Sequence, residues 1–314
     1  MADQKRGVAI LGIFVADLAF RAGRMPGVGE TIIGSGFKIG PGGKGSNQAV
    51  AAARAGAPVT FISRLGKDEF GALALAAWRR EGIVARIVET QQEPTGAAFI
   101  YVNDRSGENA IIVVPGAAGS ISAADVDAAA DAIRAAAVFV TQLEQPVPAA
   151  RRGLEIAKEA GVITLFNPAP AVTIDDSIYA LCDFVTPNES EASLLTGLPV
   201  TNLEESRRAA EVFLKKGAGA ALITLGEAGA LFHDASQSTL IPAFDAGPVV
   251  ETAGAGDAFA GGFAAALARG DDPVDAARFG CAVAGISVTR AGTAPSMPRR
   301  SEVDKLLERH SVKG

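Results

Sequence analysis

Cysteine and histidine are scarce in this sequence of 314 residues, and their scarcity excludes several kinds of chemistry. The two cysteines, Cys182 and Cys281, cannot form a disulfide framework, and their apolar or small neighbours predict buried thiols in a reducing cytoplasm. The two histidines, His233 and His310, lie far apart in the sequence, near predicted loop or terminal regions. Neither a Ser/His/Asp arrangement nor a zinc site is therefore expected.

Long hydrophobic runs and an excess of positive charge are also missing. No run approaches the length of a membrane span, and the first apolar run is too short for a signal-peptide core followed by a cleavage site. The formal net charge of -6 argues against nucleic acid as a partner. We therefore expect a cytoplasmic protein with neither a membrane nor nucleic acid as a partner. Its 48% of hydrophobic residues is enough for a sizeable core.

Short β-branched runs alternate with amphipathic or alanine-rich segments along most of the chain. This alternation predicts crossover connections and an α/β fold with a doubly wound, mostly parallel sheet. It breaks around residues 18–39 and 96–114, where strand-like runs are joined by turns without a helix. The predicted strands are Val8–Phe14, Val59–Ser63, Val138–Thr141, Val162–Phe166, Asp183–Thr186 and Ala220–Leu225. The predicted helices are Gln48–Ala55, Phe70–Glu81, Ala123–Ala136, Ala149–Ala160, Glu189–Thr196, Leu203–Lys216 and Val274–Val288.

The segment Thr252–Asp257 has the composition of an anion-binding turn and leads directly into an apolar helical stretch. Its small residues, Ala253–Gly256, let backbone N–H groups approach an anion at the positive end of a helix. Phosphoryl transfer needs such a cradle together with a carboxylate that accepts the proton of the attacking hydroxyl, and Asp257 supplies one. Taken alone, Asp257 fits an N-cap as well as it fits a base.

A second glycine cluster, Gly40–Asn47, precedes a predicted alanine-rich helix. Its glycines let a polar small molecule reach the backbone, and Lys44 and Asn47 supply a cation and an amide suited to hydroxyl groups. A Walker A loop is excluded because Lys44 is followed by Gly45 instead of Ser or Thr. The spacing fits the dinucleotide pattern G-x-G-x-x-G, but Pro41 stiffens the turn and no acid follows some twenty residues later, so dinucleotide binding is the weaker alternative. A glycine-rich hinge is another.

Together, Gly42–Ala49 and Thr252–Phe259 resemble the two signatures of the ribokinase family of carbohydrate kinases. Four further segments resemble ribokinase segments in the same order, namely residues 167–171, 186–192, 222–226 and 288–292. The resemblance covers essentially the whole chain and implies a single ribokinase-like domain over residues 1–314. It also implies a small β-sheet lid, formed by about residues 16–40 and 95–115, that covers the sugar and pairs two subunits into a homodimer.

The resemblance implies transfer of the ATP γ-phosphate to a sugar hydroxyl, with D-ribose as the leading substrate and ribose 5-phosphate as product. Asp257 is then the general base, and the backbone amides of Gly254, Ala255 and Gly256 form an anion hole. The residues expected to hold the sugar are Asp17, Gly43, Lys44, Asn47, Glu144 and Asp257. Those expected at ATP and the water shell of Mg²⁺ are Asn188, Glu191, Thr224, Gly226, Glu227 and Gly256. A K⁺ ion would be held, mostly by backbone oxygens, at Glu251, Ala253, Ser287, Arg290, Gly292 and Ser296.

Independently of the resemblance, polar residues follow several predicted strands. Asp17, Glu144, Asn188 and Gly226 each come just after a strand-like run, and ligands of open parallel sheets bind beyond the carboxyl ends of the strands. These residues can therefore border one crevice. Some of the candidate residues also have a plainer interpretation: Asp17 as a turn cap, Lys44 as a solvated charge, Glu144 as a loop start, and Asn188 with Glu191 as a helix-capping signal.

Two positions depart from the ribokinase pattern and leave the acceptor and the cation open. Val15 stands where ribokinases have Asn, so a ribose hydroxyl directed at it would lose a partner, at a cost of about 1–3 kcal/mol. Fructose, 2-keto-3-deoxygluconate, deoxyribose and adenosine are therefore alternative acceptors. Glu251 replaces the usual Asp, which leaves K⁺ activation open. A sugar- or nucleotide-binding regulator without turnover is the alternative of a different class, and the retained Asp257 argues against it.

Overall fold

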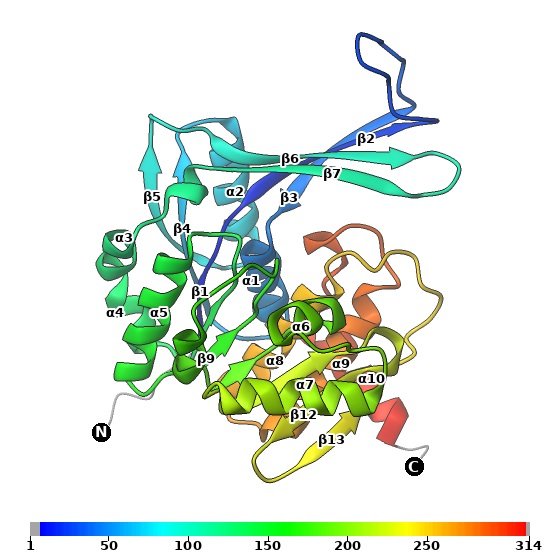
Figure 1. Cartoon of the computed structure of the whole chain (residues 1–314). Coiled ribbons are helices and arrows are strands. Elements are labelled where there is room, and N and C mark those ends of the chain that lie inside the picture. The colour runs from blue at the N-terminus through cyan, green and yellow to red at the C-terminus, as the bar shows by residue number, and fades with distance from the viewer. Residues whose placement is uncertain (1–6, 312–314) are drawn as a thin grey trace.

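A nine-stranded sheet runs through the centre of the protein, of which the computed structural model describes residues 7–311 (Figure 1). Its strand order is β13-β12-β11-β10-β9-β8-β1-β4-β5. The strands from β11 to β5 pair in parallel, whereas β12 and β13 add an antiparallel hairpin at one edge. The strands are β1 (Val8–Leu11), β4 (Val59–Gly66), β5 (Val84–Thr90), β8 (Val138–Thr141), β9 (Ile163–Phe166), β10 (Phe184–Val185), β11 (Ala220–Thr224), β12 (Ala230–Asp234) and β13 (Ser238–Ile241).

Helices cover both faces of this sheet, as the doubly wound prediction requires. In the buried strand β1, Val8 and Ile10 pack in one apolar cluster and Ala9 and Leu11 in the other, because successive side chains point to opposite faces. The first cluster includes residues of α1 (Lys44–Arg54), α2 (Glu69–Arg80), α8 (Ala255–Arg269), α9 (Pro273–Ser287) and α10 (Arg300–Ser311). The second includes residues of α3 (Ala123–Ala128), α4 (Ala130–Ala135), α5 (Val147–Glu159), α6 (Glu189–Thr196) and α7 (Leu203–Lys215). Short 3₁₀ helices span Ala117–Ser120, Asp176–Leu181, Gly226–Ala228 and Ala294–Ser296.

Three predicted element boundaries were wrong. The helix expected from Gln48 begins at Lys44, so Lys44 and Asn47 lie in its first turn and not in a loop. The first strand ends at Leu11, because the chain passes so close to α1 that a Cβ at Gly12 would lie 2.7 Å from the Cα atom of Gly45. The helix expected over residues 123–136 is split into α3 and α4. Strands β5, β12 and β13 and helix α10 were not predicted.

A second sheet of four strands lies above the main sheet, at the top of the molecule in Figure 1. Two antiparallel hairpins, β2–β3 and β6–β7, are joined by the parallel pair β2–β6. They occupy the two places where the alternation of strands and helices breaks in the sequence. The strands are β2 (Val15–Ala22), β3 (Gly36–Gly42), β6 (Thr95–Asn103) and β7 (Asn109–Gly116), and we call this sheet the lid.

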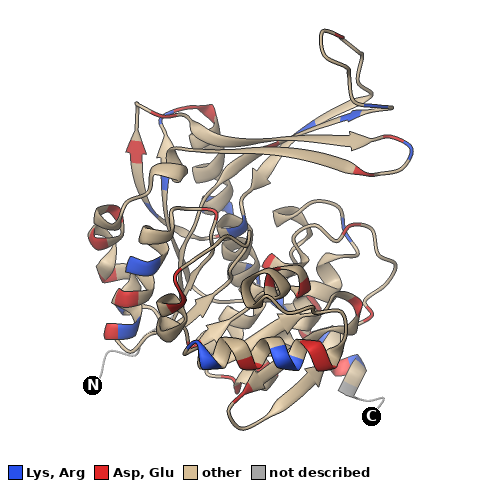
Figure 2. Ribbon diagram, viewed as in Figure 1, with Lys and Arg blue, Asp and Glu red and all other residues tan. Residues whose placement is uncertain are grey.

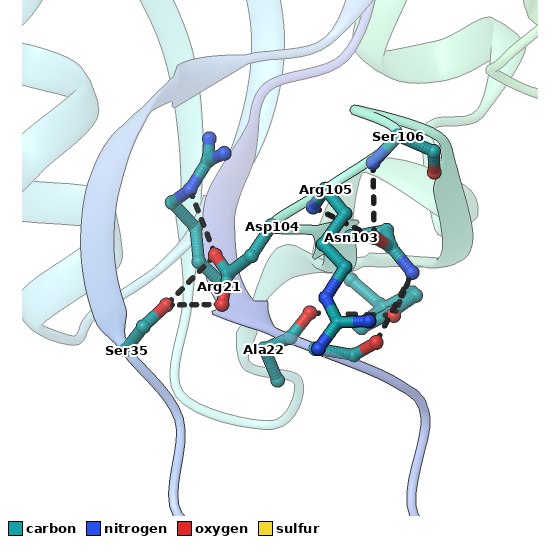
Figure 3. A network of polar contacts seen from close by, with 9 residues as sticks. Arg21, Ala22, Ser35, Asn103, Asp104, Arg105 and Ser106 are labelled. Atoms are coloured by element: carbon teal, nitrogen blue, oxygen red, sulfur yellow. Dashed lines mark hydrogen bonds and ion pairs between the residues drawn. The ribbon is translucent and has the colours of Figure 1, made fainter.

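Polar contacts tie the far ends of the two lid hairpins together (Figure 3). The carboxylate of Asp104 accepts hydrogen bonds from the Ser35 hydroxyl at 2.7 and 2.8 Å and from Arg21 Nε at 3.3 Å. Next to it, Oδ1 of Asn103 accepts the backbone N–H groups of Arg105 and Ser106 and closes the β6–β7 turn. Because Arg21 is half exposed, its ion pair adds little stability, about 1 kcal/mol at most, and its main effect is to fix how the hairpins align.

Cys182 and Cys281 are both buried free thiols, as expected. Within residues 7–311, no helix has the length and apolar character needed to cross a lipid bilayer.

Candidate active site

The carboxyl ends of the parallel strands gather most of the predicted polar residues at one edge of the sheet. Glu144 follows β8, Asn188 follows β10, and Thr224 ends β11. Asn188 and Thr224 also pair directly in a short parallel bridge, and the Thr224 N–H donates to the Pro187 carbonyl at 3.0 Å. Parallel strands end at the same edge, so these residues border a common site.

Asp257 lies in the first turn of α8 and joins the two glycine motifs. Its carboxylate accepts hydrogen bonds from Asn47 Nδ2 to Oδ2 at 3.0 Å and from Gln48 Nε2 to Oδ1 at 3.1 Å. The N-cap of α8 is Gly254, so the interpretation of Asp257 as the N-cap was wrong. Burial raises the pKa of Asp257, while Lys44 and the two amide donors oppose this rise.

The backbone at the start of α8 needs glycine at one position and leaves one amide without a hydrogen-bond acceptor. Gly254 is left-handed at a φ of 82°, and a Cβ there would lie 3.3 Å from Thr293. The Ala255 N–H donates to the Thr252 carbonyl at 3.1 Å, so in this conformation it is not free for an anion. Within residues 7–311, the Gly256 N–H has no hydrogen-bond acceptor, and a Cβ on Gly256 would meet no atom within 4 Å. The positive end of α8 therefore offers Gly256 to an anion.

Helix α1 begins at a second glycine with positive φ. Gly43 has a φ of 90°, and a Cβ there would lie 2.5 Å from the Ile13 carbonyl oxygen. The following Lys44 N–H donates to Glu144 Oε2 at 2.7 Å. The pKa of the Lys44 ammonium is raised, chiefly by Asp257 and further by Glu144 and Glu191, against the opposing effect of burial. Lys44 is thus a cation surrounded by carboxylates.

The carboxylates around Lys44 resist ionisation because they are buried close to one another. Burial raises the pKa of Glu144 to about 7, with Lys44 opposing and Asp257 and Asp17 adding to the rise. The pKa of Asp17 is raised to about 6 by burial and by Glu251. The Asp17 carboxylate packs on Gly42 so closely that a Cβ there would lie 2.1 Å from its Oδ1. Asp17, Lys44, Glu144 and Asp257 therefore act as one electrostatic group.

The donor and acceptor balance of this group suits an uncharged ligand rich in hydroxyl groups. Carboxylates accept hydrogen bonds from hydroxyls, and Lys44 donates to them. The buried Oδ1 of Asn47 has no hydrogen-bond partner in the part of the chain that the structure describes. A buried acceptor without a partner costs free energy, and a ligand hydroxyl would satisfy it.

The residues expected at the nucleotide lie at the start of α6 and the end of β11. Asn188 and Glu191 form a reciprocal capping box, with N–O distances of 2.8 and 2.9 Å, which confirms the interpretation of the pair as a helix-capping signal. The pKa of Glu191 is raised by burial and by Asp257, and lowered by the Asn188 N–H and by Lys44. Glu191 therefore belongs to the same electrostatic group. Gly226 opens a 3₁₀ turn at a φ of 53°, and Glu227 follows it on the surface.

The residues expected at a monovalent cation come from two segments that lie against each other. Oε2 of Glu251 accepts the Gly292 N–H at 2.8 Å, and the Val288 carbonyl accepts the N–H of Glu251 at 3.1 Å. The hydroxyls of Ser287 and Ser296 donate to the carbonyls of Ala284 and Thr293, and the Arg290 guanidinium pairs with Glu302. Ala253 precedes Gly254, which itself lies against Thr293.

Three buried amides of the site were missed as functional candidates. Gln48 contacts Asp257, and both Asn167 and Gln142 contact Gln48. A usable signal existed, because Gln142 follows β8 and Asn167 follows β9 as Glu144 and Asn188 follow their strands. A polar residue directly after a buried parallel strand points to this edge whether it is charged or not.

The pfkB family of carbohydrate kinases matches residues 5–300 of the chain. The chain belongs to this family. It is similar to the ribokinase of Haemophilus influenzae, at 39% identity over 305 residues that cover 97% of this chain and 99% of that protein. It is 37% identical over 302 residues to the deoxyribokinase of Salmonella typhi, covering 96% of this chain and 98% of that protein.

Solved structures agree with the pfkB family assignment. The structure of Arabidopsis thaliana ribokinase complexed with ribose and ATP matches with a TM-score of 0.90 at 32% identity, covering 96% of this chain and 99% of that chain. The comparisons confirm the resemblance of the glycine motifs and the ribokinase-like α/β fold with its smaller second sheet. They also confirm the expected activity class, an ATP-dependent sugar kinase.

Proposed function

We propose that the protein transfers the γ-phosphate of ATP to D-ribose and forms ribose 5-phosphate. The observation that carries this proposal is the contact between the two glycine motifs, in which Asn47 and Gln48 hold Asp257 beside Lys44. A cation, a carboxylate base and a helix N-terminus in one place are the parts that phosphoryl transfer to a hydroxyl needs. Ribokinases of 35–39% identity among the relatives support ribose as the acceptor.

Each part of the site has a role in this reaction. Asp17, Lys44, Asn47 and Glu144 hydrogen-bond the sugar hydroxyls and orient one of them toward the phosphate. Asp257 takes the proton of that hydroxyl as it attacks. The Gly256 amide, at the positive end of α8, stabilises the negative charge on the transferring group. The carboxylates of this group would also repel an acceptor that already carries a phosphate.

Asn188 and Glu191 fit a place beside the phosphates of ATP and the water shell of Mg²⁺. One Glu191 oxygen accepts the Asn188 N–H, which leaves the other for a metal-bound water. Mg²⁺ would neutralise phosphate charge there when bound. Thr224, Gly226 and Glu227, at the end of the adjacent strand, would contact the nucleotide.

A second acceptor, 2-deoxyribose, is favoured by one residue. Val15 and Asp17 are two positions apart on β2 and so share one face of the lid, and Val15 is only 3% exposed. Its isopropyl group makes no hydrogen bond, which suits a sugar carbon without a hydroxyl. The deoxyribokinase among the relatives agrees with this alternative. Fructose, 2-keto-3-deoxygluconate and adenosine remain further acceptors to compare.

We also propose that K⁺ binds beside the anion hole. Glu251, Ala253, Ser287, Arg290, Gly292 and Ser296 would hold it. The fit rests on the contact of Glu251 with Gly292, which brings the two segments together, and on backbone carbonyls, which are oxygen ligands suited to such an ion.

The outward face of the lid fits an interface with a second copy of this chain. Phe20 lies opposite Phe37 in the strand pairing and its ring also contacts the ring of Phe99 at a tilt, with centroids 5.7 Å apart. Ile112 lies opposite Phe99, so these side chains share a face. Phe20, Phe37 and Ile112 are 42%, 56% and 64% exposed. Strands β6 and β7 carry no charged residue along their length (Figure 2). We propose a homodimer through this face, since such an apolar surface is typical of a subunit interface.

The proposal includes one ribokinase-like domain over residues 1–314, with lid segments at about 16–40 and 95–115, working in the cytoplasm. Its test is ADP release from Mg²⁺-ATP with each acceptor in turn. Ribose-dependent turnover supports the proposal. Turnover with 2-deoxyribose alone would make 2-deoxyribose the acceptor in place of ribose. No turnover with any acceptor would favour a sugar- or nucleotide-binding regulator.

A further inference from the structure

We infer that Gln48 and Gln142 are positioning residues that aim the Asp257 carboxylate and keep it ionised. The inference rests on the proposed function, in which Asp257 is the base. It comes from a chain of buried side-chain amides that runs from the ends of β8, β9 and β10 to Asp257.

A backbone carbonyl fixes one end of this series of hydrogen-bonded amides. Asn167 Nδ2 donates to the Thr186 carbonyl oxygen at 2.7 Å. A carbonyl can only accept, so the Asn167 amide must turn its nitrogen toward Thr186 and its Oδ1 away. That Oδ1 accepts Gln48 Nε2 at 3.0 Å. The same Nε2 donates its second hydrogen to Oδ1 of Asp257 at 3.1 Å.

Gln142 fixes the other end of the Gln48 amide. Its Nε2 donates to Gln48 Oε1 at 2.5 Å, and both side chains are fully buried. Two glycines make room for it, because a Cβ at Gly12 or Gly45 would lie 2.6 or 2.9 Å from Gln142 Oε1. The Gln48 amide is therefore held from both ends in one orientation.

The orientation matters because the reverse one is strongly unfavourable. A flipped Gln48 would direct its oxygen at Asn167 Oδ1 and at the Asp257 carboxylate, where no hydrogen is available to bridge them. In the observed orientation Asn47 and Gln48 each donate to a different carboxylate oxygen. The carboxylate plane is thereby fixed, and each oxygen keeps a lone pair for the sugar hydroxyl.

The same donors counter the burial of Asp257. Asp257 is only 6% exposed, and burial alone disfavours the ionised form that accepts a proton. Hydrogen bonds to the carboxylate favour ionisation. Among residues 7–311, the Gln142 side chain makes no hydrogen bond to Asp257 or to the proposed sugar-binding residues, so its effect on Asp257 passes through Gln48.

The test compares Gln48→Met and Gln142→Met with wild type in the pH dependence of kcat/KM. Gln48→Met keeps the side-chain length and removes the donor, so the acidic limb should move to higher pH by about one unit and kcat should fall about tenfold. Gln142→Met should shift the limb in the same direction by less. The matched control is Gln145→Met, which removes another buried amide whose partners are Thr141 and the Gln142 backbone. It should lower stability without moving the limb.

A second readout does not depend on turnover. The pKa of Asp257 can be titrated by ¹³C NMR of labelled aspartate carboxyls, with its resonance assigned as the one lost in Asp257→Asn. The inference predicts a higher pKa in Gln48→Met and Gln142→Met, and an unchanged pKa in Gln145→Met. The inference is overturned if Gln48→Met and Gln142→Met both leave the pKa of Asp257 and the acidic limb of kcat/KM unchanged. Failure of the proposed function would look different: no sugar turnover in wild type, with the pKa shifts intact.

Discussion

The side-chain amide of Asn47 donates to the carboxylate of Asp257 at 3.0 Å, although the two residues are 210 positions apart in the sequence. Helices α1 and α8 come close enough for this contact because Gly261 faces α1, where a Cβ would lie 2.5 Å from both the Ala51 Cβ and the Gln48 carbonyl oxygen. The small residues of α8 therefore set the distance between Asp257 and Asn47. The candidate site therefore contains residues of both glycine motifs, which these hydrogen bonds hold together.

Glu144→Gln is expected to stabilise the protein near pH 8 while it weakens sugar binding. The pKa of Glu144 is raised from 4.5 to about 7, so the folded protein binds its proton more tightly than the unfolded chain does. Ionisation of Glu144 therefore lowers the free energy of unfolding as the pH rises from about 4.5 through 7, by about 3 kcal/mol once it is complete. The Tm difference between variant and wild type should be large near pH 8 and small near pH 5.

The sugar KM of Glu144→Gln should rise about tenfold or more, because a charged hydrogen-bond acceptor is lost. Glu211→Gln, which changes an exposed carboxylate on α7, is the control for the melting curves. A Tm difference for Glu144→Gln that is the same at both pH values would contradict the account.

Val15→Asn should improve the use of ribose relative to 2-deoxyribose. An amide at this position can donate to and accept from a hydroxyl where valine cannot, which is worth about tenfold or more in the ratio of the two kcat/KM values. Val84→Asn, on the exposed β5, is the control. If the ratio stays at the wild-type value, Val15 does not face the sugar.

Ile112→Glu should convert a dimer into monomers, because it buries a charge at the centre of an apolar interface. Light scattering coupled to size exclusion measures the mass directly. Leu240→Glu introduces the same charge on the exposed strand β13, away from the lid, and should leave the dimer intact. A monomeric wild-type protein, or a dimeric Ile112→Glu variant, would contradict the proposed homodimer through the lid.

K⁺ should give a higher kcat than Na⁺ at equal ionic strength. Glu251→Ala should lose most of this difference, because its carboxylate holds the Gly292 N–H and with it the second segment of the proposed cation site. The measurement is initial rate against cation concentration, with choline as the inert reference. Equal rates of the wild-type enzyme in K⁺, Na⁺ and choline would refute a functional cation here.

The alternation of strands and helices, and the two glycine motifs, could be predicted from the sequence because local patterns encode them. Val138–Thr141 is rich in β-branched residues and begins with three apolar ones, as expected for a strand buried on both faces. The start of α1 could not be predicted, since the residues 42–45 have low helix propensity and Gly43 begins the helix through its positive φ and its contact with Ile13.

The hydrogen bonds among Gln48, Gln142 and Asn167 could not be predicted from the sequence for a different reason. The places of Gln142 and Asn167 directly after β8 and β9 indicate the end of the sheet at which they lie, but only the packing of α1 against these strand ends brings both of them to Gln48. The edge strand β5 was missed because its alternating exposed and half-buried residues, including Arg86 and Glu89, weaken the apolar signal.

The most direct test of the account is ³¹P NMR of the products that wild type and Asp257→Asn form from Mg²⁺-ATP and D-ribose. Wild type should form ribose 5-phosphate in step with ADP. Asp257→Asn should bind ATP as wild type does, by calorimetry, yet form the product at least about 100-fold more slowly, because the hydroxyl loses its base. A variant that makes the same product at nearly the wild-type rate would contradict the assignment of Asp257 as the base.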